Sequence, residues 1–455
     1  MNYDLTVGEP RKRIWRYTLP LFAGSIFQQM YNLADSFIAG NFIGQDALAA
    51  VGNSYEITLV YLAFATGCNM GCSVIISQLF GAKRLRDMKT AIGTTFISCT
   101  VLCALLMILG FLFSPTLLRL IETPDVLFDD SLKYINIYTG GLIFLFIYNI
   151  STGIFSALGD SKTPFYFLAV SSIANIFMDI LFVDPFNMGV AGVAWATFIC
   201  QGISCICAVV ALFIRLKKID HNDDESGAKL KFFSFSMLKS ISLMAIPGIL
   251  QQSFISVGNI FIQRVVNGFG PDVIAGYSAA IKLNNLLIVS LTTLGSGISS
   301  FTAQNAGAKK FDRVKSVYKT SILMMWTILI PFVALYILFR EQLISLFINQ
   351  PTAQAIQTGS EFILIVIPFQ FVVSVKLTFD CIFRGLGLMK YFMISTFSDL
   401  IIRVVMSYIL AAWLGSALGI WLSWPVGWFI GAVIAVLLYV FGKWQNFELN
   451  IQTSK

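Results

Sequence analysis

Two aspartates stand inside long apolar stretches of the chain. Asp35 lies in QQMYNLADSF, and Asp179 closes the segment NIFMD, in which Asn175 precedes it by one helical turn. A charge at the centre of a bilayer costs about 2.5–3.5 kcal/mol on insertion scales, so such groups are functional by default. Two carboxylates that face a shared cavity could bind a cation or share a proton, because burial disfavours the charged form of an acid.

Further polar residues of the first half could complete such a site. Helical spacing places Gln28, Tyr31 and Asn32 on one face with Asp35. Other apolar stretches contain Thr197, Asn149 and Thr152, whose side-chain oxygens could join this site. We predict a cation-coupling site for H⁺ or Na⁺, with a possible Na⁺ at Asp35, Asn175 and Asp179. Its predicted members are Asp35, Asn175, Asp179, Thr197, Thr152 and Asn149. The alternative is a structural role, in which the two aspartates only satisfy neighbouring polar groups.

The second half carries different intramembrane charges. Lys376, Asp380 and Arg384 follow at i,i+4 spacing, as do Asp399 and Arg403, so internal salt bridges would mask their charge. Lys282 has no obvious local partner in the sequence. The candidates for a substrate cavity are Gln28, Tyr31, Asn32, Gln252, Lys282, Asp380, Asp399 and Arg403.

Composition indicates that membrane-spanning helices position these residues. Of the 455 residues, 57% are hydrophobic and only 12% are charged, whereas soluble proteins carry about 25% charged residues. Apolar runs recur along the chain, each long enough to cross a bilayer of about 30 Å. We therefore predict an all-α polytopic membrane protein with twelve transmembrane helices. The predicted spans are 14–38, 55–79, 92–114, 134–156, 164–183, 190–214, 239–263, 274–303, 317–338, 358–383, 391–413 and 418–441.

The positions of Lys and Arg predict the orientation. Basic residues gather in alternate loops, such as Lys83 to Lys89 and Lys309 to Lys315. Because cytosolic loops are rich in Lys and Arg, this pattern predicts a cell-membrane protein with both termini in the cytosol. A polar cytosolic linker at 215–236 divides an N-terminal lobe, 1–214, from a C-terminal lobe, 237–455.

The two halves resemble each other at a spacing of 226 to 228 residues. SQLFGAK (77–83) matches AQNAGAK (303–309), IFSALG (154–159) matches IFRGLG (382–387), and Pro20 matches Pro247. An even number of spans per half predicts two six-helix lobes related by an axis along the membrane normal, with a cleft between them. Asp35 and Asp179 have no counterparts in the second half, which favours a special function for the first.

Several motifs together resemble the multidrug and toxic compound extrusion (MATE) family. They are MYNLADSFIAGNFIGQDALAAVG, SQLFGAK, ALGDSKTP and NIFMDILFV followed by NMGVAGVAWATFICQ. The similarity spans the whole chain and is greater to DinF-like and MepA-like bacterial members than to the NorM-like branch. The resemblance implies an N-lobe cation site that includes Asp35, Asn175, Asp179 and Thr197. Thr152 stands where many members have Asn or Glu, and Gln251 and Gln252 stand where NorM-like members have a seventh-span Glu.

These features predict a secondary active multidrug exporter. Amphipathic or cationic organic compounds would leave in exchange for H⁺ or Na⁺ by alternating access, without a cofactor, and the protein would work as a monomer in the bilayer. A lipid-linked precursor flippase of the same superfamily is the alternative, since Lys282, Lys376 and Arg403 could attract an anionic headgroup. The basic residues lie in short loops, which argues against nucleic-acid binding. The chain lacks H-E-x-x-H, G-x-S-x-G and P-loop motifs, so an enzyme is not expected.

Overall fold

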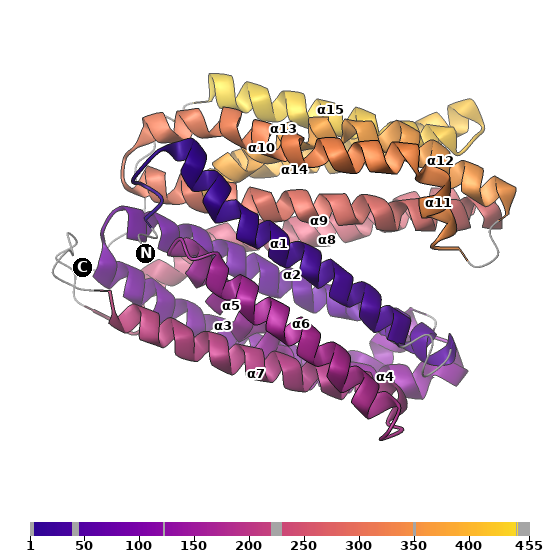
Figure 1. Ribbon diagram of the computed structural model, residues 1–455, viewed down its shortest axis with the longest axis horizontal. Coiled ribbons are helices and arrows are strands. Elements are labelled where there is room, and N and C mark those ends of the chain that lie inside the picture. Colours follow the sequence, from indigo (N-terminus) through magenta and orange to yellow (C-terminus); the bar gives the residue numbers. More distant parts are fainter. Residues whose placement is uncertain are drawn as a thin grey trace. The chain divides into compact units, whose positions relative to one another are not determined.

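Helices make up nearly all of the structure (Figure 1). A computed structural model describes residues 4–38, 45–121, 123–219, 230–348, 352–442 and 444, without the side chains of 31–38, 45–49, 53, 55 and 56. No strand occurs in these ranges. The elements are α1 (Pro10–Ile38), α2 (Gln45–Gly81), α3 (Leu85–Leu120), α4 (Asp125–Gly140), α5 (Leu142–Ala157), α6 (Lys162–Val183), α7 (Gly189–Lys217), α8 (Phe235–Asn267), α9 (Pro271–Gly307), α10 (Phe311–Leu338), α11 (Arg340–Ser345), α12 (Ala353–Val366), η2 (Ile367–Phe369), α13 (Gln370–Leu386), α14 (Met389–Leu414) and α15 (Leu418–Phe441).

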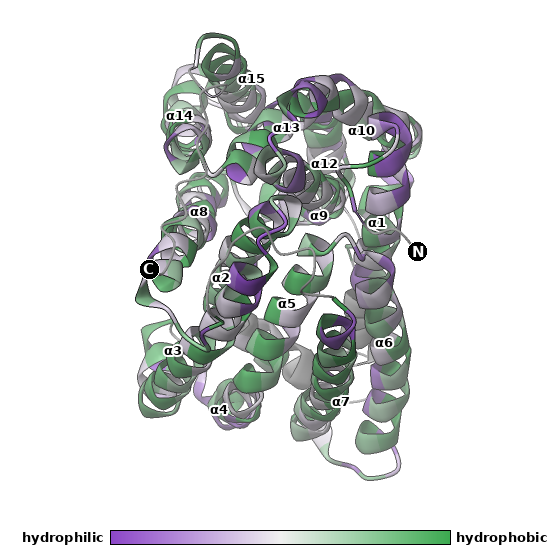
Figure 2. Ribbon diagram, turned by 90° about the vertical axis from the view of Figure 1, so that its left-hand side faces the viewer, coloured by the Kyte–Doolittle hydropathy of each residue, from purple (hydrophilic) through white to green (hydrophobic). Residues whose placement is uncertain are grey.

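The predicted spans all fall in helical segments. Within the described residues, 10 segments are long and apolar enough to cross a membrane, or 11 if the bent pair α4 and α5 is one span. The remaining predicted span, 14–38, lies in α1, a helix of 29 residues with several polar side chains in its sequence. Most of the helical ribbon is hydrophobic (Figure 2). The protein is therefore an all-α, multi-pass membrane protein.

Two predicted spans are interrupted in the structure. The span predicted at 134–156 bends by 47° between α4 and α5, where Gly140 and Gly141 have no Cβ to pack against the next turn. The span predicted at 358–383 contains the short 3₁₀ segment η2 with Pro368, which has no N–H to donate to the preceding turn. Breaks in spanning helices are tolerated where neighbouring groups satisfy the freed backbone.

The predicted internal repeat is confirmed by the turns that end its helices. α2 and α9 each have 37 residues and end at the glycine of a Gly-Ala-Lys sequence. The lysines that follow, Lys83 and Lys309, both adopt positive φ, at 54° and 58°. Gly159 and Gly387 likewise share positive φ, at 78° and 75°. The two halves thus repeat their turn conformations as well as their sequence.

The chain forms two compact units. The first unit consists mainly of Leu19–Ile249, and the second of Leu5–Thr18 together with Leu250–Glu448. The chain passes from one unit to the other within α1 and again within α8. Each crossing lies close to a proline, Pro20 or Pro247. The first part of each repeat's opening helix therefore belongs to the other repeat's unit, while the predicted lobe boundaries at 214 and 237 stay a prediction.

The segment before α1 is bonded tightly to the second unit. The backbone N–H of Leu5 donates to Gln304 Oε1 at 2.9 Å, and the Lys310 ammonium donates to the carbonyl of Thr6 at 3.0 Å. The Arg313 guanidinium donates to the carbonyl of Gly8 at 2.6 Å. Gln304 belongs to AQNAGAK (303–309), one of the repeated motifs, and Lys310 and Arg313 follow this motif closely. The motif thus anchors the start of the chain.

The segment before α8 is bonded to the first unit in a similar way. The backbone N–H groups of Lys231 and Ser234 donate to the hydroxyls of Thr90 and Thr94 at 3.2 and 3.0 Å. The early part of α8 then packs on α2, where a Cβ at Gly71 would meet Ala245 Cβ at 2.8 Å. Both crossing helices are therefore fixed at their starts before they change units.

Candidate functional site

In α6 the buried face is polar and the exposed face is apolar. Apart from Pro164 near its start, the buried residues of α6 are Ser172, Asn175, Asp179 and Val183, at successive helical turns. Asp179 is 0% exposed and Asn175 3% exposed. The outer face carries Tyr166, Val170, Ile173, Phe177 and Leu181. This inverted pattern suits a helix with lipid on one side and a polar site on the other.

The start of α6 is fixed by the motif ALGDSKTP. Asp160 Oδ1 accepts hydrogen bonds from the backbone N–H groups of Lys162 and Thr163 at 3.2 and 3.1 Å. Its other carboxylate oxygen accepts from the Thr163 hydroxyl at 2.8 Å. A carboxylate at this position satisfies N–H groups that have no partner within the helix. Asp160 thereby sets where the Ser172–Asn175–Asp179 stripe begins.

α7 lies side by side with α6 and brings a thiol to the stripe (Figure 1). Cys200 is buried and interacts with the Asp179 carboxylate and the Asn175 side chain. Thr197 stands one turn before Cys200 and is half-buried. Cys200 is not among the site residues that the sequence predicts. Its spacing from Thr197 was the signal that could have identified it.

Asn149 and Thr152 are held in a network on α5. The Thr152 hydroxyl donates to the carbonyl of Asn149 at 2.9 Å, and Asn69 Nδ2 of α2 donates to the same carbonyl at 2.8 Å. The Asn149 side chain donates to the carbonyl of Leu145 at 2.8 Å. These bonds tie the two predicted ligands to α2 and to their own helix. Asn69 was not predicted from the sequence.

The other first-unit candidates lie on α1. Tyr31, Asn32 and Asp35 belong to the helical backbone of α1, but their side chains lie outside the described residues. Gln28 is exposed. Beside it, Phe27 packs edge-on against Phe165 of α6, with ring centroids 5.8 Å apart. α1 therefore contacts α6 along the stretch that leads to Asp35.

The second unit brings together buried charges from two helices, α13 and α14. Lys376 Nζ of α13 lies 2.9 Å from Asp380 Oδ2 and 3.5 Å from Asp399 Oδ2 of α14. The predicted Lys376–Asp380 pair is confirmed. The sequence had paired Asp399 with Arg403, whereas the structure places the Lys376 ammonium between both carboxylates. Arg403 instead stacks on Trp424 of α15, with its guanidinium carbon 4.3 Å from the ring centroid.

The remaining second-unit candidates are dispersed. Gln252 on α8 is exposed. Lys282 on α9 is exposed too, and its ammonium lies 5.8 Å from the centroid of the Phe347 ring. Arg384 bonds to Ser299 and to the Cys381 sulfur, each at 3.4 Å. Of the predicted substrate-cavity residues in this unit, the structure groups only Asp380, Asp399 and Arg403.

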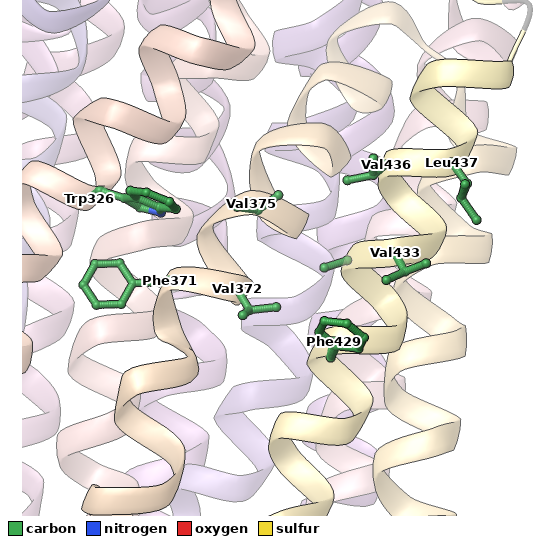
Figure 3. Close-up of a pocket in the computed structure, with 9 residues that line it drawn as sticks. Trp326, Phe371, Val372, Val375, Phe429, Val433, Val436 and Leu437 are labelled. Carbon is green, nitrogen blue, oxygen red and sulfur yellow. The ribbon is translucent and has the colours of Figure 1, made fainter.

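An open apolar cavity of about 340 Å³ also lies at the surface of the second unit, where lining side chains such as Phe429 and Leu437 are exposed. Figure 3 shows Trp326 of α10, Phe371 and Val375 of α13, and Phe429 and Val433 of α15 around it. The only polar atom drawn there is the Trp326 ring nitrogen, and it donates to the Ser374 hydroxyl at 3.0 Å. The cavity is therefore suited to hydrocarbon or aromatic groups.

The two units thus offer two kinds of polar chemistry. The first unit presents a carboxylate, an amide and a thiol, which can ligate a small cation or exchange a proton. Neither the stretch between Arg16 and Lys83 nor that between Lys162 and Arg215 contains a Lys or Arg. The second unit surrounds its carboxylates with cations from its own helices.

Comparison with models of known protein families shows to which family the chain belongs. The family model MatE matches the chain twice, at residues 20–181 and 247–409, and so covers both halves of the repeat. The chain belongs to the MATE family. It is therefore a transport protein rather than an enzyme. A second family model, lipid II flippase MurJ, matches residues 128–266.

Individual proteins similar to this chain carry names that fit a transporter of the MATE family. The probable multidrug resistance protein YpnP of Bacillus subtilis (strain 168) is 29% identical over 454 residues, which cover 98% of each chain. The FAD transporter of Shewanella oneidensis is 25% identical over 358 residues, or 76% of each chain. Of these two relatives, YpnP supports assignment of the MATE chain as a multidrug transporter.

Solved structures show the same fold. A multidrug resistance MATE family transporter in an outward-facing conformation aligns with a TM-score of 0.88 at 23% identity, over 97% of each chain. A MOP superfamily transporter from Pyrococcus furiosus aligns with a TM-score of 0.89 at 23% identity, also over 97% of each chain. This MATE chain therefore has the two-lobe fold of those transporters.

Proposed function

We propose that the protein is a secondary active exporter of amphipathic, often cationic, organic compounds, driven by the inward movement of H⁺ or Na⁺. Alternating access would connect the substrate site first to the cytosol and then to the outside. The protein would act as a monomer in the cell membrane, with both termini in the cytosol. No cofactor takes part beyond the coupling ion.

One observation carries this proposal, namely the buried Ser172–Asn175–Asp179 stripe on a helix whose outer face is apolar. A carboxylate held there must be neutralised by a proton, a metal cation or a fixed positive charge. The spans α6 and α7 hold no Lys or Arg between Lys162 and Arg215. A mobile cation is therefore the neutralising species that we propose.

The register of α1 against α6 supports a role for Asp35. A Cβ at Gly24 would lie 3.6 Å from both Phe165 and Leu168. The two helices run in the same direction (Figure 1), and Asp35 follows Gly24 by as many residues as Asp179 follows Leu168. At 1.5 Å per residue, both positions lie about 16 Å further along their helices. We propose that Asp35 and Asp179 serve the same cation, with Asn175 and Thr197 as further oxygen donors.

The polarity of the second unit supports this substrate class. The cavity at Trp326, Phe371 and Phe429 is lined by apolar side chains. Aromatic faces also attract organic cations. We therefore expect lipophilic cations to be exported in preference to anions of similar size.

The decisive experiment is efflux from proteoliposomes. Purified protein would be reconstituted with a panel of cationic dyes, and a pH gradient and a sodium gradient would be imposed separately. Export driven by either gradient, and absent without both, is the expected result. Failure of both gradients to drive export of any dye would overturn the proposal.

Substitutions then test the coupling site. Asp35→Asn and Asp179→Asn should each abolish gradient-driven efflux while leaving membrane insertion unchanged. Ser172→Ala, on the same buried stripe but without a carboxylate, is the matched control and should retain efflux. Wild-type transport by both Asn variants would remove these residues from the coupling site.

A flippase is the second candidate, because the MurJ family model matches residues 128–266 and Arg403 lies buried in the second unit. A flippase would move an anionic, lipid-linked precursor between leaflets instead of releasing a dye. The same vesicles, loaded with a fluorescent polyprenyl-diphosphate lipid, separate the two functions. Lipid translocation without dye export would favour the flippase.

A further inference from the structure

The ammonium of Lys376 occupies the place that a bound cation would take in the second unit. It lies 2.9 Å from Asp380 Oδ2 and 3.5 Å from Asp399 Oδ2, and these carboxylates come from different helices, α13 and α14. Asp380 is 2% exposed and Asp399 7% exposed. The Lys376 ammonium can compensate only one of these two negative charges, and the Arg403 guanidinium, which interacts with Asp399, supplies the second positive charge.

On α15, two glycines one turn apart leave space for the lysine side chain on the third side of this site. A Cβ at Gly431 would lie 2.8 Å from Lys376 Cε and 2.9 Å from Asp399 Cβ. A Cβ at Gly427 would lie 2.9 Å from Arg403 Cβ. The lysine side chain therefore runs along bare backbone of α15. Any larger residue at these positions would fill the space that the ammonium and its stem need.

Three polar atoms of this cluster keep unused hydrogen-bonding capacity. Among the described residues, Asp380 Oδ1, Asp399 Oδ1 and Arg403 Nε are buried and have no hydrogen-bond partner. Asp399 interacts electrostatically with both Lys376 and Arg403. The site therefore remains partly unsatisfied even with the lysine in place, as expected for a pocket whose occupant does not use every oxygen.

We propose that Lys376 is a tethered cation that fills a monovalent-cation pocket formed by Asp380, Asp399 and the Gly427–Gly431 face of α15. The second unit thereby carries its own charge compensation and takes up no mobile coupling ion. Lys376 would restrict coupling to the first unit. This consequence for coupling rests on the proposed function, but occupation of the pocket does not.

A cation pocket at Lys376 predicts that a small alkylammonium ion restores stability to a variant that lacks the lysine. Lys376→Ala removes the ammonium and its stem, and leaves two buried carboxylates beside an empty channel. Breaking a buried ion pair is strongly destabilising, so the melting temperature of the detergent-solubilised protein should fall by roughly 5–15 °C. Millimolar ethylammonium or propylammonium chloride should recover at least half of that loss, because the primary ammonium can take the vacant place.

Three controls make this test specific. Tetramethylammonium chloride at equal ionic strength should not rescue Lys376→Ala, since it cannot donate hydrogen bonds. Lys376→Met fills the channel without a charge and should not respond to alkylammonium ions. The triple variant Lys376→Ala with Asp380→Asn and Asp399→Asn should be more stable than Lys376→Ala alone and should also be insensitive. The triple variant keeps the test decisive if the single variant is too unstable to purify.

The outcomes separate this inference from the proposed function. A Lys376→Ala protein as stable as wild type, or one rescued equally by tetramethylammonium, would overturn the tethered-cation assignment. Selective rescue in a protein that shows no gradient-driven efflux would remove the coupling consequence and the proposed function, while leaving the pocket established. Rescue together with efflux driven through Asp179 supports both.

Discussion

The two units hold buried carboxylates on corresponding helices of the repeat but compensate them differently. In the first unit, Asp179 on α6 stands beside an amide and a thiol, in spans without Lys or Arg. In the second unit, Asp399 on α14 shares the ammonium of Lys376 with Asp380. A carboxylate with a fixed counter-charge, such as Asp380 beside Lys376, is a structural element. We therefore propose that coupling to the ion gradient takes place in the first unit and that Lys376 keeps the second unit out of it.

The largest expected difference is between Asp179→Asn and Asp399→Asn. We expect Asp179→Asn to abolish gradient-driven dye efflux, because the coupling cation loses its charged ligand. Asp399→Asn should retain gradient dependence, since Lys376 keeps Asp380 as a partner. Efflux from proteoliposomes, normalised to the amount of inserted protein, measures both. Equal loss in the two variants would mean that the units are not functionally distinct.

The second prediction concerns a fixed positive charge that is introduced beside Asp179 in the first unit. Asn175→Lys places an ammonium four residues before Asp179, the spacing that joins Lys376 to Asp380. The new lysine should neutralise Asp179 and reduce ion-driven efflux by at least tenfold, while the protein still folds. Asn175→Gln is the matched control, and we expect it to keep most of the activity. A fully coupled Asn175→Lys protein would contradict the idea that a fixed charge replaces the mobile one.

The third prediction concerns space around the lysine. Gly431→Ala would place a methyl group 2.8 Å from Lys376 Cε, and overpacking of this kind costs about 1–3 kcal/mol. The matched control is Gly52→Ala on α2, where an added Cβ would meet nothing within 4 Å. That change should be neutral or stabilise by up to about 1 kcal/mol. Thermal unfolding in detergent gives the melting temperatures of both variants. Equal values would show that α15 can shift to accommodate the added methyl group.

The smallest effect is expected at the thiol beside Asp179. Cys200→Val keeps a similar volume but removes the S–H donor, and loss of one such interaction is worth about 1 kcal/mol, or roughly fivefold in affinity for the coupling cation. Cys205→Val, a buried thiol elsewhere on α7, should leave that affinity unchanged. The half-saturating ion concentration for efflux is the measurement. An equal shift in both variants would reduce Cys200 to a packing residue.

Much of the fold could be predicted from the sequence because lipid imposes simple rules. Apolar runs predicted all of the 10 or 11 spans found among the described residues, and the repeat was visible in motifs such as SQLFGAK and AQNAGAK, whose turns the structure reproduces. The breaks were harder to predict, since Gly140–Gly141 and Pro368 lie within continuous apolar runs. Hydropathy reports polarity but not a local bend.

The site was predicted less completely, because its contacts join different helices. The i,i+4 rule found Lys376 with Asp380, both on α13, but could not show that the same ammonium reaches Asp399 on α14. It also could not show that Cys200 faces Asp179 or that Asn69 binds the Asn149 carbonyl. Ser172 was not predicted either, although its position one turn before Asn175 could have indicated the longer buried stripe.

The exchange of opening segments between the units has a consequence for biosynthesis. Leu5 bonds to Gln304, which is 299 residues later in the chain. At 5–20 residues per second, the ribosome needs about 15–60 s to make that partner after the first residues emerge. The start of α1 must wait for that time without its final contacts, and the first unit in turn lacks the beginning of α8 until translation is past its midpoint. Neither unit therefore has all of its final contacts until both copies of the repeat have been made.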